Sequence, residues 1–264
     1  MSPLKLMTNT QFLNSLITCP KPNPQASVRL FCFPYAGGSS LIFRQWRDYL
    51  PATIELCPVE IPGRGTQMKS PPFTRLEPLV RAIASAIQPY LDKPFAFFGH
   101  SMGGLVSFEL TRLLRKQYGI SPNYLFISGR CAPQVPNSEP PIHNLPEQEF
   151  LEELRRFNGT PTSVLENSEL MQLFLPILRA DFAVLETYVY AEQPPLNCPI
   201  TVCGGLQDQE VSYDQLLAWQ EQTCNSFSVH MLPGDHFFVH SSQQQLLEII
   251  SRTMNEFSHL SPAD

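Results

Sequence analysis

Residues 95–104 read Phe-Ala-Phe-Phe-Gly-His-Ser-Met-Gly-Gly, and this stretch decides the fold. The apolar run at 95–98 predicts a buried strand, and apolar residues at helical spacing predict a helix over 103–118. A short glycine-rich segment separates the two, so the chain must reverse sharply between strand and helix. Such a turn pushes the hydroxyl of Ser101 into the open at the edge of a sheet. The alternative is a plain turn in which Ser101 only caps the helix.

The same alternation of short apolar runs and helical segments continues along the chain. Strands are predicted at 28–33, 54–59, 95–98, 124–128, 200–203 and 227–232, and helices at 79–91, 103–118, 216–223 and 243–257. The strands are apolar without alternation, which is typical of strands covered on both faces. The sequence therefore predicts an α/β fold with a mostly parallel central sheet flanked by helices.

One segment, residues 132–198, contains no convincing strand. Helical patterns occupy 147–156 and 170–190, between the fourth and fifth predicted strands. An insertion there lies near the strand ends where open α/β sheets bind ligands, so we interpret it as a helical lid. An ordinary helical subdomain is the alternative. The predicted division is a mobile N-terminal extension at 1–27, a core formed by 28–131 and 199–264, and the lid at 132–198.

Composition and charge exclude several classes of protein. The formal net charge of −6 and the lack of a basic run argue against nucleic-acid binding. No apolar stretch approaches the roughly 18 residues of a membrane span. The chain has seven cysteines, an odd number with no Cys-x-x-Cys spacing. This pattern indicates reduced thiols in a cytoplasmic protein rather than a disulfide framework or a metal site.

A serine nucleophile needs a base that takes its proton. Residues 99–103 fit Gly-x-Ser-x-Gly, which between a strand and a helix is the nucleophile elbow of the α/β-hydrolase fold. The base of that fold is expected in the loop after the last strand, where His236 follows a Pro-Gly turn. His240 is the alternative base.

The base needs a carboxylate that orients it, and the expected chain order is serine, acid, histidine. Asp208 follows the fifth predicted strand after Gly204 and Gly205. Its loop lies beside the loop of the base if the fifth and sixth strands are neighbours. Glu210 and Asp214 are the alternative acids.

Two backbone N–H groups are expected to stabilise a negatively charged oxygen that forms during the reaction. The first is the N–H of Met102, at the N-terminus of the helix that follows the elbow. The second should come from residues 33–39, Phe-Pro-Tyr-Ala-Gly-Gly-Ser, which follow the first predicted strand. The Ala36 N–H is the candidate and the Gly37 N–H the alternative. A plain turn without this role also fits the segment.

Taken together, these residues resemble the type II thioesterases, the free-standing α/β-hydrolase thioesterases of nonribosomal peptide and polyketide synthesis. The resemblance spans roughly residues 28–250. It departs from the family at Gly104, where alanine is frequent, and at 66–70, which lack the Arg and Glu often found there. The matching stretches are 33–38 (Phe-Pro-Tyr-Ala-Gly-Gly), 62–65 (Pro-Gly-Arg-Gly), 99–103, 108–110 (Phe-Glu-Leu), 178–182 (Leu-Arg-Ala-Asp-Phe), 198–200 (Cys-Pro-Ile), 204–208 and 234–238 (Gly-Asp-His-Phe-Phe).

The resemblance implies an enzyme that hydrolyses acyl or aminoacyl thioesters from the phosphopantetheine arm of carrier proteins, and so removes stalled or mis-primed groups from a synthase. It implies a catalytic triad of Ser101, Asp208 and His236. It implies no metal and no cofactor of its own, because the phosphopantetheine belongs to the carrier protein. We expect a monomer without nucleic-acid or membrane partners. The residues expected to contact substrate, mostly from the lid, are Tyr35, Phe150, Leu154, Phe174, Leu178 and Phe237; the alternative for most of these is the lid's own core.

Two other functions remain open at this point. A small-molecule carboxylesterase or lipase would use the same triad on free esters. A non-catalytic binding protein of this fold is less well supported, because such proteins usually lack a member of the triad. The sequence does not separate hydrolysis from transfer of the acyl group to another acceptor.

Overall fold

The computed structural model describes residues 16–19, 23–136, 139–157, 159 and 162–258 of the 264-residue chain. At its centre lies a six-stranded sheet in the order β2-β1-β3-β4-β5-β6, and every neighbouring pair is parallel. This confirms the predicted fold class and places β5 beside β6. The strands are β1 (Val28–Phe33), β2 (Ile54–Pro58), β3 (Phe95–His100), β4 (Tyr124–Ser128), β5 (Ile200–Gly205) and β6 (Phe227–Leu232).

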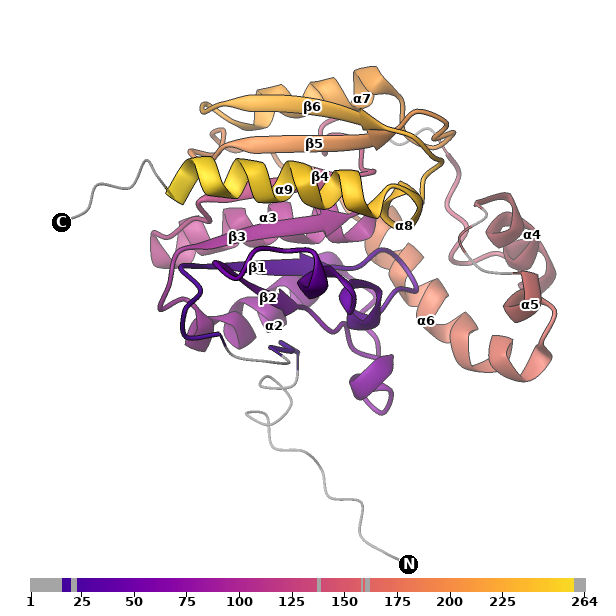
Figure 1. The fold of residues 1–264 in the computed structure, drawn as a ribbon. Coiled ribbons are helices and arrows are strands. Elements are labelled where there is room, and N and C mark those ends of the chain that lie inside the picture. Colours follow the sequence, from indigo (N-terminus) through magenta and orange to yellow (C-terminus); the bar gives the residue numbers. More distant parts are fainter. Residues whose placement is uncertain (1–15, 20–22, 137–138, 158, 160–161, 259–264) are drawn as a thin grey trace, which may run out of the picture.

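Helices cover both faces of the sheet (Figure 1). Successive strand residues point to opposite faces, so Leu30 and Cys32 of β1 pack in one apolar cluster and Phe31 and Phe33 in the other. The first cluster lies under 3-10 helices η1 (Ser40–Phe43) and η2 (Trp46–Asp48) and helix α9 (Gln243–Ser258). The second lies under α2 (Leu76–Ile87), α3 (Met102–Tyr118) and η5 (Ala218–Gln222).

Some helix boundaries differ from the predicted ones for local reasons. The helix predicted to reach residue 91 ends as α2 at Ile87, and the 3-10 helix η4 (Gln88–Tyr90), which contains Pro89, follows it. The segment predicted at 216–223 is α7 (Tyr213–Leu217), which starts at a capping box between Ser212 and Gln215, followed by η5. The remaining short elements are η3 (Gly65–Gln67) and α8 (Phe238–Ser241).

Three helices form the segment predicted as a lid: α4 (Glu147–Phe157), α5 (Thr162–Leu165) and α6 (Ser168–Glu186). Figure 1 shows them beyond one end of the sheet, with α6 reaching the sheet and α4 and α5 farther out. The helix predicted to continue to residue 190 ends at Glu186. The lid has an apolar cluster of its own, formed by Ile142, Phe150, Leu154, Leu165, Met171, Leu175 and Leu178.

The described part of the N-terminal segment packs on the sheet. Leu16 is fully buried, Ile17 pairs with Val59 in an isolated antiparallel bridge, and the Thr18 N–H donates to Pro58 O at 2.9 Å. Residues 16–19 are therefore part of the packed core, which differs from the expected mobile extension. Residues 1–15 and 20–22 lie outside the described residues.

None of the helices described is long and apolar enough to cross a membrane. Within the same residues, no three His, Cys, Asp or Glu side chains are grouped so that they could hold a metal ion. All seven cysteines are free of disulfide bonds.

Candidate active site

The turn between β3 and α3 has the strained geometry that its sequence predicts. Ser101 has φ 51° and ψ −112°, and it is the one non-glycine residue among those described with a positive φ. The residues two positions before and after Ser101 must be glycine. A Cβ on Gly99 would lie 2.1 Å from the Gly103 carbonyl oxygen, and a Cβ on Gly103 would lie 2.1 Å from the Phe33 carbonyl oxygen. The Ser101 N–H donates to Ser128 O at 2.8 Å, which fixes the turn to β4. The strained conformation is therefore held by close packing on both sides.

Asp208 and His236 meet at the ends of β5 and β6, as predicted from the pairing of these strands. His236 Nδ1 lies 2.9 Å from Asp208 Oδ2, and the Asp208 side chain is fully buried. The N–H groups of Glu210 and Val211 donate to Asp208 Oδ1 at 2.8 and 3.2 Å. With both of its oxygens engaged, the carboxylate is fixed, and it in turn fixes the orientation of the imidazole.

Two hydrogen bonds that the sequence did not predict join these two loops. Gln207 Oε1 accepts from the Gly234 N–H at 2.7 Å, and the Gln207 N–H donates to Gly234 O at 3.0 Å. The acid loop and the base loop are thus linked directly, one residue before the acid and two before the base.

The charge of the imidazole depends on two carboxylates. Burial lowers the pKa of His236, but the Asp208 hydrogen bond and the charges of Glu210 and Asp208 raise it more, so the net shift is upward. Glu210 Oε2 lies 3.7 Å from His236 Nε2, the nitrogen not bound to Asp208. Burial raises the pKa of Glu210 itself. Glu210, an alternative acid in the sequence, therefore faces the other side of the ring.

The remaining alternatives have other contacts. His240 Nε2 lies 2.9 Å from the Tyr35 hydroxyl, and burial lowers the pKa of His240. Asp214 lies in the first turn of α7. Asp235, which precedes the base and was not among those alternatives, accepts from the Phe237 N–H through Oδ1 at 2.9 Å.

Aromatic rings surround the base. Tyr35 contacts His100, Phe237 and His240 edge-on, with centroid distances of 5.7, 5.2 and 5.7 Å. His100 is fully buried, shares a hydrogen bond of 2.8 Å with Ser128 Oγ, and lies 5.4 Å from the His236 ring. Of the residues expected to contact substrate, Phe237 packs against the His236 ring at 5.4 Å, and Tyr35 packs against Phe237.

The two candidates for the second oxyanion donor, the N–H groups of Ala36 and Gly37, differ in their hydrogen bonds. The Gly37 N–H donates to Asp181 Oδ2 at 2.7 Å, so this donor is occupied. Among the residues that the structure describes, the Ala36 N–H has no acceptor. Met102 is the first residue of α3, where an N–H has no partner within the helix. The geometry thus favours the Ala36 candidate over the Gly37 alternative.

Asp181 and Arg64 are functional candidates that the sequence reasoning did not assign. Arg64 Nη1 and Nη2 lie 2.5 and 2.6 Å from the two Asp181 oxygens, and the side chains are only 3% and 2% exposed. Glu60, which is also buried, accepts from Ser40 Oγ at 2.6 Å. The signal was present: Arg64 and Asp181 both lie in stretches that carried the family resemblance, but nothing in the sequence shows that they meet.

The lid residues expected to contact substrate lie mainly inside the lid. Phe150 and Leu154 are 0% and 3% exposed and pack in the lid cluster, with Phe174 against it. In this conformation they form the core of the lid, which was the alternative interpretation. Leu178 belongs to the same cluster but also faces the loop after β1, since a Cβ on Gly37 would lie 2.7 Å from Leu178 Cδ2.

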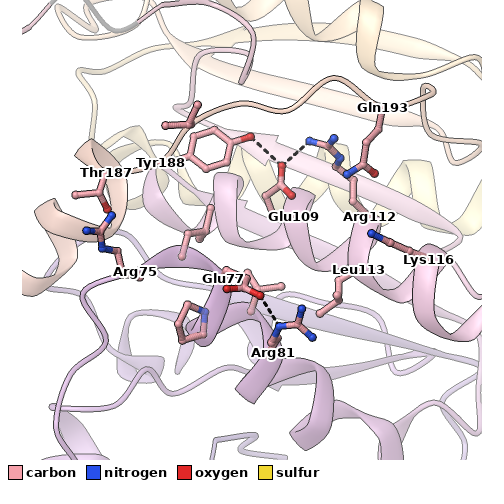
Figure 2. A pocket seen from close by; sticks show the side chains of 14 residues that line it. Arg75, Glu77, Arg81, Glu109, Arg112, Leu113, Lys116, Thr187, Tyr188 and Gln193 are labelled. Atoms are coloured by element: carbon pink, nitrogen blue, oxygen red, sulfur yellow. Dashed lines mark hydrogen bonds and ion pairs between the residues drawn. The ribbon is translucent and has the colours of Figure 1, made fainter.

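A cavity of about 480 Å³ lies away from these residues, between α2, α3 and the segment after α6 (Figure 2). Its polar side chains pair largely with one another: Tyr188 Oη and Arg112 Nη1 both donate to Glu109 Oε1, at 2.8 and 2.6 Å. Neither Ser101 nor Asp208 nor His236 lines it. The lining residues are Arg75, Leu76, Glu77, Pro78, Val80, Arg81, Glu109, Arg112, Leu113, Lys116, Thr187, Tyr188, Val189 and Gln193.

Known proteins resemble this chain over nearly its whole length. Residues 28–254 match the thioesterase domain family. Gramicidin S biosynthesis protein GrsT of Aneurinibacillus migulanus is 45% identical over 93% of this chain and 94% of GrsT. Linear gramicidin dehydrogenase LgrE of Brevibacillus parabrevis is 50% identical over 90% and 92%. The crystal structure of ClbQ from the colibactin NRPS/PKS pathway has a TM-score of 0.85 and 34% identity over 89% of this chain and 100% of ClbQ.

These similarities fit the geometry of the site. The name of LgrE denotes a dehydrogenase, but this chain has no Gly-x-Gly-x-x-Gly fingerprint of a dinucleotide site. The structure of human thioesterase 2 has a TM-score of 0.69 at 26% identity, in agreement with an α/β-hydrolase fold. The family match covers most of the chain and includes the elbow, the acid loop and the base loop. The chain belongs to the thioesterase family and is therefore an enzyme that hydrolyses thioesters.

Proposed function

We propose that this chain is a type II thioesterase that removes stalled or mis-primed acyl and aminoacyl groups from the phosphopantetheine arms of carrier proteins in a peptide or polyketide synthase. The observation that carries the chemistry is the hydrogen bond from His236 to the buried Asp208, in a fold that also holds Ser101 in a strained turn at the end of β3. The substrate class rests on relatives. YbtT, whose structure is 34% identical with a TM-score of 0.79, is titled a type II thioesterase from the yersiniabactin NRPS/PKS pathway.

The proposed reaction begins at Ser101. Its Oγ attacks the thioester carbonyl carbon while His236 Nε2 takes the hydroxyl proton, and Asp208 holds the imidazole and stabilises its positive charge. The carbonyl oxygen becomes an oxyanion that accepts hydrogen bonds from the Met102 and Ala36 N–H groups. Each such donor contributes about 10²- to 10³-fold to the rate in related chemistry.

The intermediate then breaks its C–S bond. The pantetheine sulfur leaves with the proton held by His236, and an ester remains on Ser101. Water gives a proton to the same imidazole and attacks the ester carbon. The bond from that carbon to Ser101 Oγ then breaks, His236 returns the proton to Oγ, and the carboxylic acid leaves. A thiol has a pKa of about 8.5, so the leaving group needs little help from an acid. Every step uses groups of the protein, the substrate and water, so the proposal requires no cofactor.

The proposed division of the chain follows from the position of the site. Residues 28–131 and 199–264 carry the elbow, the acid and the base, and residues 132–198 form a lid that selects the acyl group. Carrier protein domains are the proposed partners, and we propose that the enzyme acts as a monomer in the cytoplasm.

The test compares acyl release from holo carrier proteins loaded with acetyl, butyryl or aminoacyl groups with hydrolysis of nitrophenyl esters. We expect faster release from carriers, lost in Ser101→Ala and retained in Ser85→Ala, a control on exposed α2 surface. Hydrolysis of free esters without release from carriers would instead favour the carboxylesterase. No release by the wild type from any carrier would contradict the proposal.

A further inference from the structure

We infer that Asp181, held by Arg64, is a positioning residue for the oxyanion hole, and that it joins lid helix α6 to the loop after β1. The inference rests on the proposed function, because it concerns the loop that carries the Ala36 N–H. Asp181 does not touch the reacting atoms. It acts through the backbone of Gly37, the residue next to the proposed donor.

The backbone amide of Gly37 is bound to Asp181. Gly37 has φ +78°, a left-handed conformation that glycine adopts readily and other residues rarely do. Its N–H donates to Asp181 Oδ2 at 2.7 Å, and a hydrogen bond to a carboxylate is stronger than one to a neutral acceptor. Successive amides of a turn point in different directions. The Gly37 N–H and the Ala36 carbonyl belong to one planar peptide group, so the bond to Asp181 fixes this plane. The Ala36 N–H belongs to the preceding plane, which is joined to the fixed one through the two backbone dihedrals of Ala36 and is restrained by it.

The side chain of Asp181 is buried together with that of Arg64. A carboxylate that is 2% exposed needs full compensation, and Arg64 supplies it with two short bonds. Arg64 Nη1 also donates to Gly38 O at 3.2 Å, so the guanidinium binds the same loop on the other side of Gly37. Asp181 and Arg64 thus bind the loop at two points, the Gly37 N–H and the Gly38 carbonyl.

Asp181 belongs to lid helix α6, whereas Gly37 belongs to the loop after β1. Leu178 and Asp181 lie three residues apart on α6, on the same face, and both reach Gly37. This part of α6 is therefore attached to the catalytic loop and cannot move away without breaking a buried ion pair. The position of the lid helix and the geometry of the oxyanion hole are coupled, so any opening of the lid must occur farther out, at α4 and α5.

The experiment compares two matched variants. Asp181→Asn removes the charge of a buried carboxylate that binds one Arg and one backbone N–H. Glu55→Gln does the same at the opposite ends of the strands, because buried Glu55 accepts from Arg29 Nε at 2.6 Å and from the Asn23 N–H at 2.9 Å. Hydrolysis of butyryl-pantetheine is measured per folded site, counted by complete labelling of Ser101 with a fluorophosphonate.

We expect Asp181→Asn to lower kcat by about 10- to 100-fold with little change in KM, and Glu55→Gln to leave kcat unchanged. The affinity for a trifluoromethyl ketone, whose adduct with Ser101 places an oxyanion in the hole, should fall by the same factor as kcat. Equal kcat in wild type and Asp181→Asn would overturn the inference. Failure of the wild type on carriers would count against the proposed function instead, since this comparison uses a free thioester.

A measurement on the wild type covers the case in which Asp181→Asn does not fold. In amide NMR spectra, the trifluoromethyl ketone should shift the Ala36 and Met102 signals, while the Gly37 amide stays protected from hydrogen exchange. A large shift of Gly37 with none at Ala36 would show that Gly37 is the donor, and it would overturn the role assigned to Asp181.

Discussion

Two buried carboxylates, Asp208 and Asp181, hold the two sides of this site in different ways. Asp208 binds a side chain, the imidazole of His236, and its own loop supplies two further N–H donors. Asp181 binds a backbone amide of a loop far away in the sequence, and Arg64 balances its charge. The first binds the imidazole that takes and returns the proton in the proposed reaction, so it can influence that proton. The second binds a backbone amide and a guanidinium, so it acts through position. Burial of an acid in a site therefore does not reveal its role, whereas the group to which the acid is hydrogen-bonded does.

The largest effect is expected from Asp208→Asn. An amide at this position keeps the shape but allows the wrong tautomer of His236, which lowers kcat by about 10⁴-fold in enzymes with this arrangement. The measurement is the rate of acyl release from loaded carrier proteins, with thermal unfolding as the check on folding. A loss smaller than that of Asp181→Asn would mean that the roles of the two acids have been exchanged.

Among single changes at Asp181, at Arg64 or in the loop after β1, Arg64→Ala should lower the free energy of unfolding most. It leaves a buried carboxylate without its cation, and breaking a buried pair in this way costs about 3–5 kcal/mol. The free energy of unfolding, from urea titration, is the measurement. Arg64→Lys should recover only part of it, because lysine does not make the paired contacts of a guanidinium. A loss below about 1 kcal/mol would show that the pair is not needed to keep Asp181 buried.

Gly37→Ala isolates the contact between the loop and lid helix α6. A Cβ at Gly37 would meet Leu178 Cδ2 at 2.7 Å, and φ is +78°. Gly119→Ala is the matched control, since φ is +68° there and an added Cβ would have no atom within 4 Å. Both changes should cost about 1–2 kcal/mol of stability from backbone strain, but only Gly37→Ala should also lower kcat. Equal kcat in the two variants would show that the contact between Gly37 and helix α6 does not affect catalysis.

The smallest effect is expected from Glu210→Gln, which tests the Asp208 side. His236 must be neutral to take a proton, so kcat/KM rises with pH through the pKa of His236. The charge of Glu210 raises that pKa, so its removal should move the acid limb to lower pH, by less than about one unit, with the plateau unchanged. The pH profile of kcat/KM, with Gln209→Ala as the control, measures it. A shift to higher pH would contradict the assigned electrostatics.

The sequence predicted the Asp208 side of the site because its elements are local. Strands β5 and β6 are apolar runs that end in glycine-rich turns, and the acid and the base follow those turns directly. Once the strands are known to be neighbours, the two side chains must meet. The same reasoning predicted all six strands and the strained turn at Ser101, for which pattern and spacing are sufficient.

The Asp181 side was not predictable in the same way. Asp181 is 117 residues from Arg64 and 144 from Gly37 along the chain, and no periodicity links them. The packing of α6 on the loop after β1 depends on how the lid docks, which single-sequence patterns do not specify. The burial of residues 16–19 was missed for a similar reason, since a short bridge to Val59 gives no repeating pattern.

The most direct test of this division of roles is the pH profile of kcat/KM for Asp208→Asn and Asp181→Asn, measured on the same acyl thioester. We expect Asp208→Asn to lower the plateau and to move the acid limb to lower pH, because the Asp208 hydrogen bond raises the pKa of His236. We expect Asp181→Asn to lower the plateau and to leave the acid limb where it is in the wild type. A limb that moves in Asp181→Asn, or one that stays fixed in Asp208→Asn, would contradict the roles assigned to the two acids.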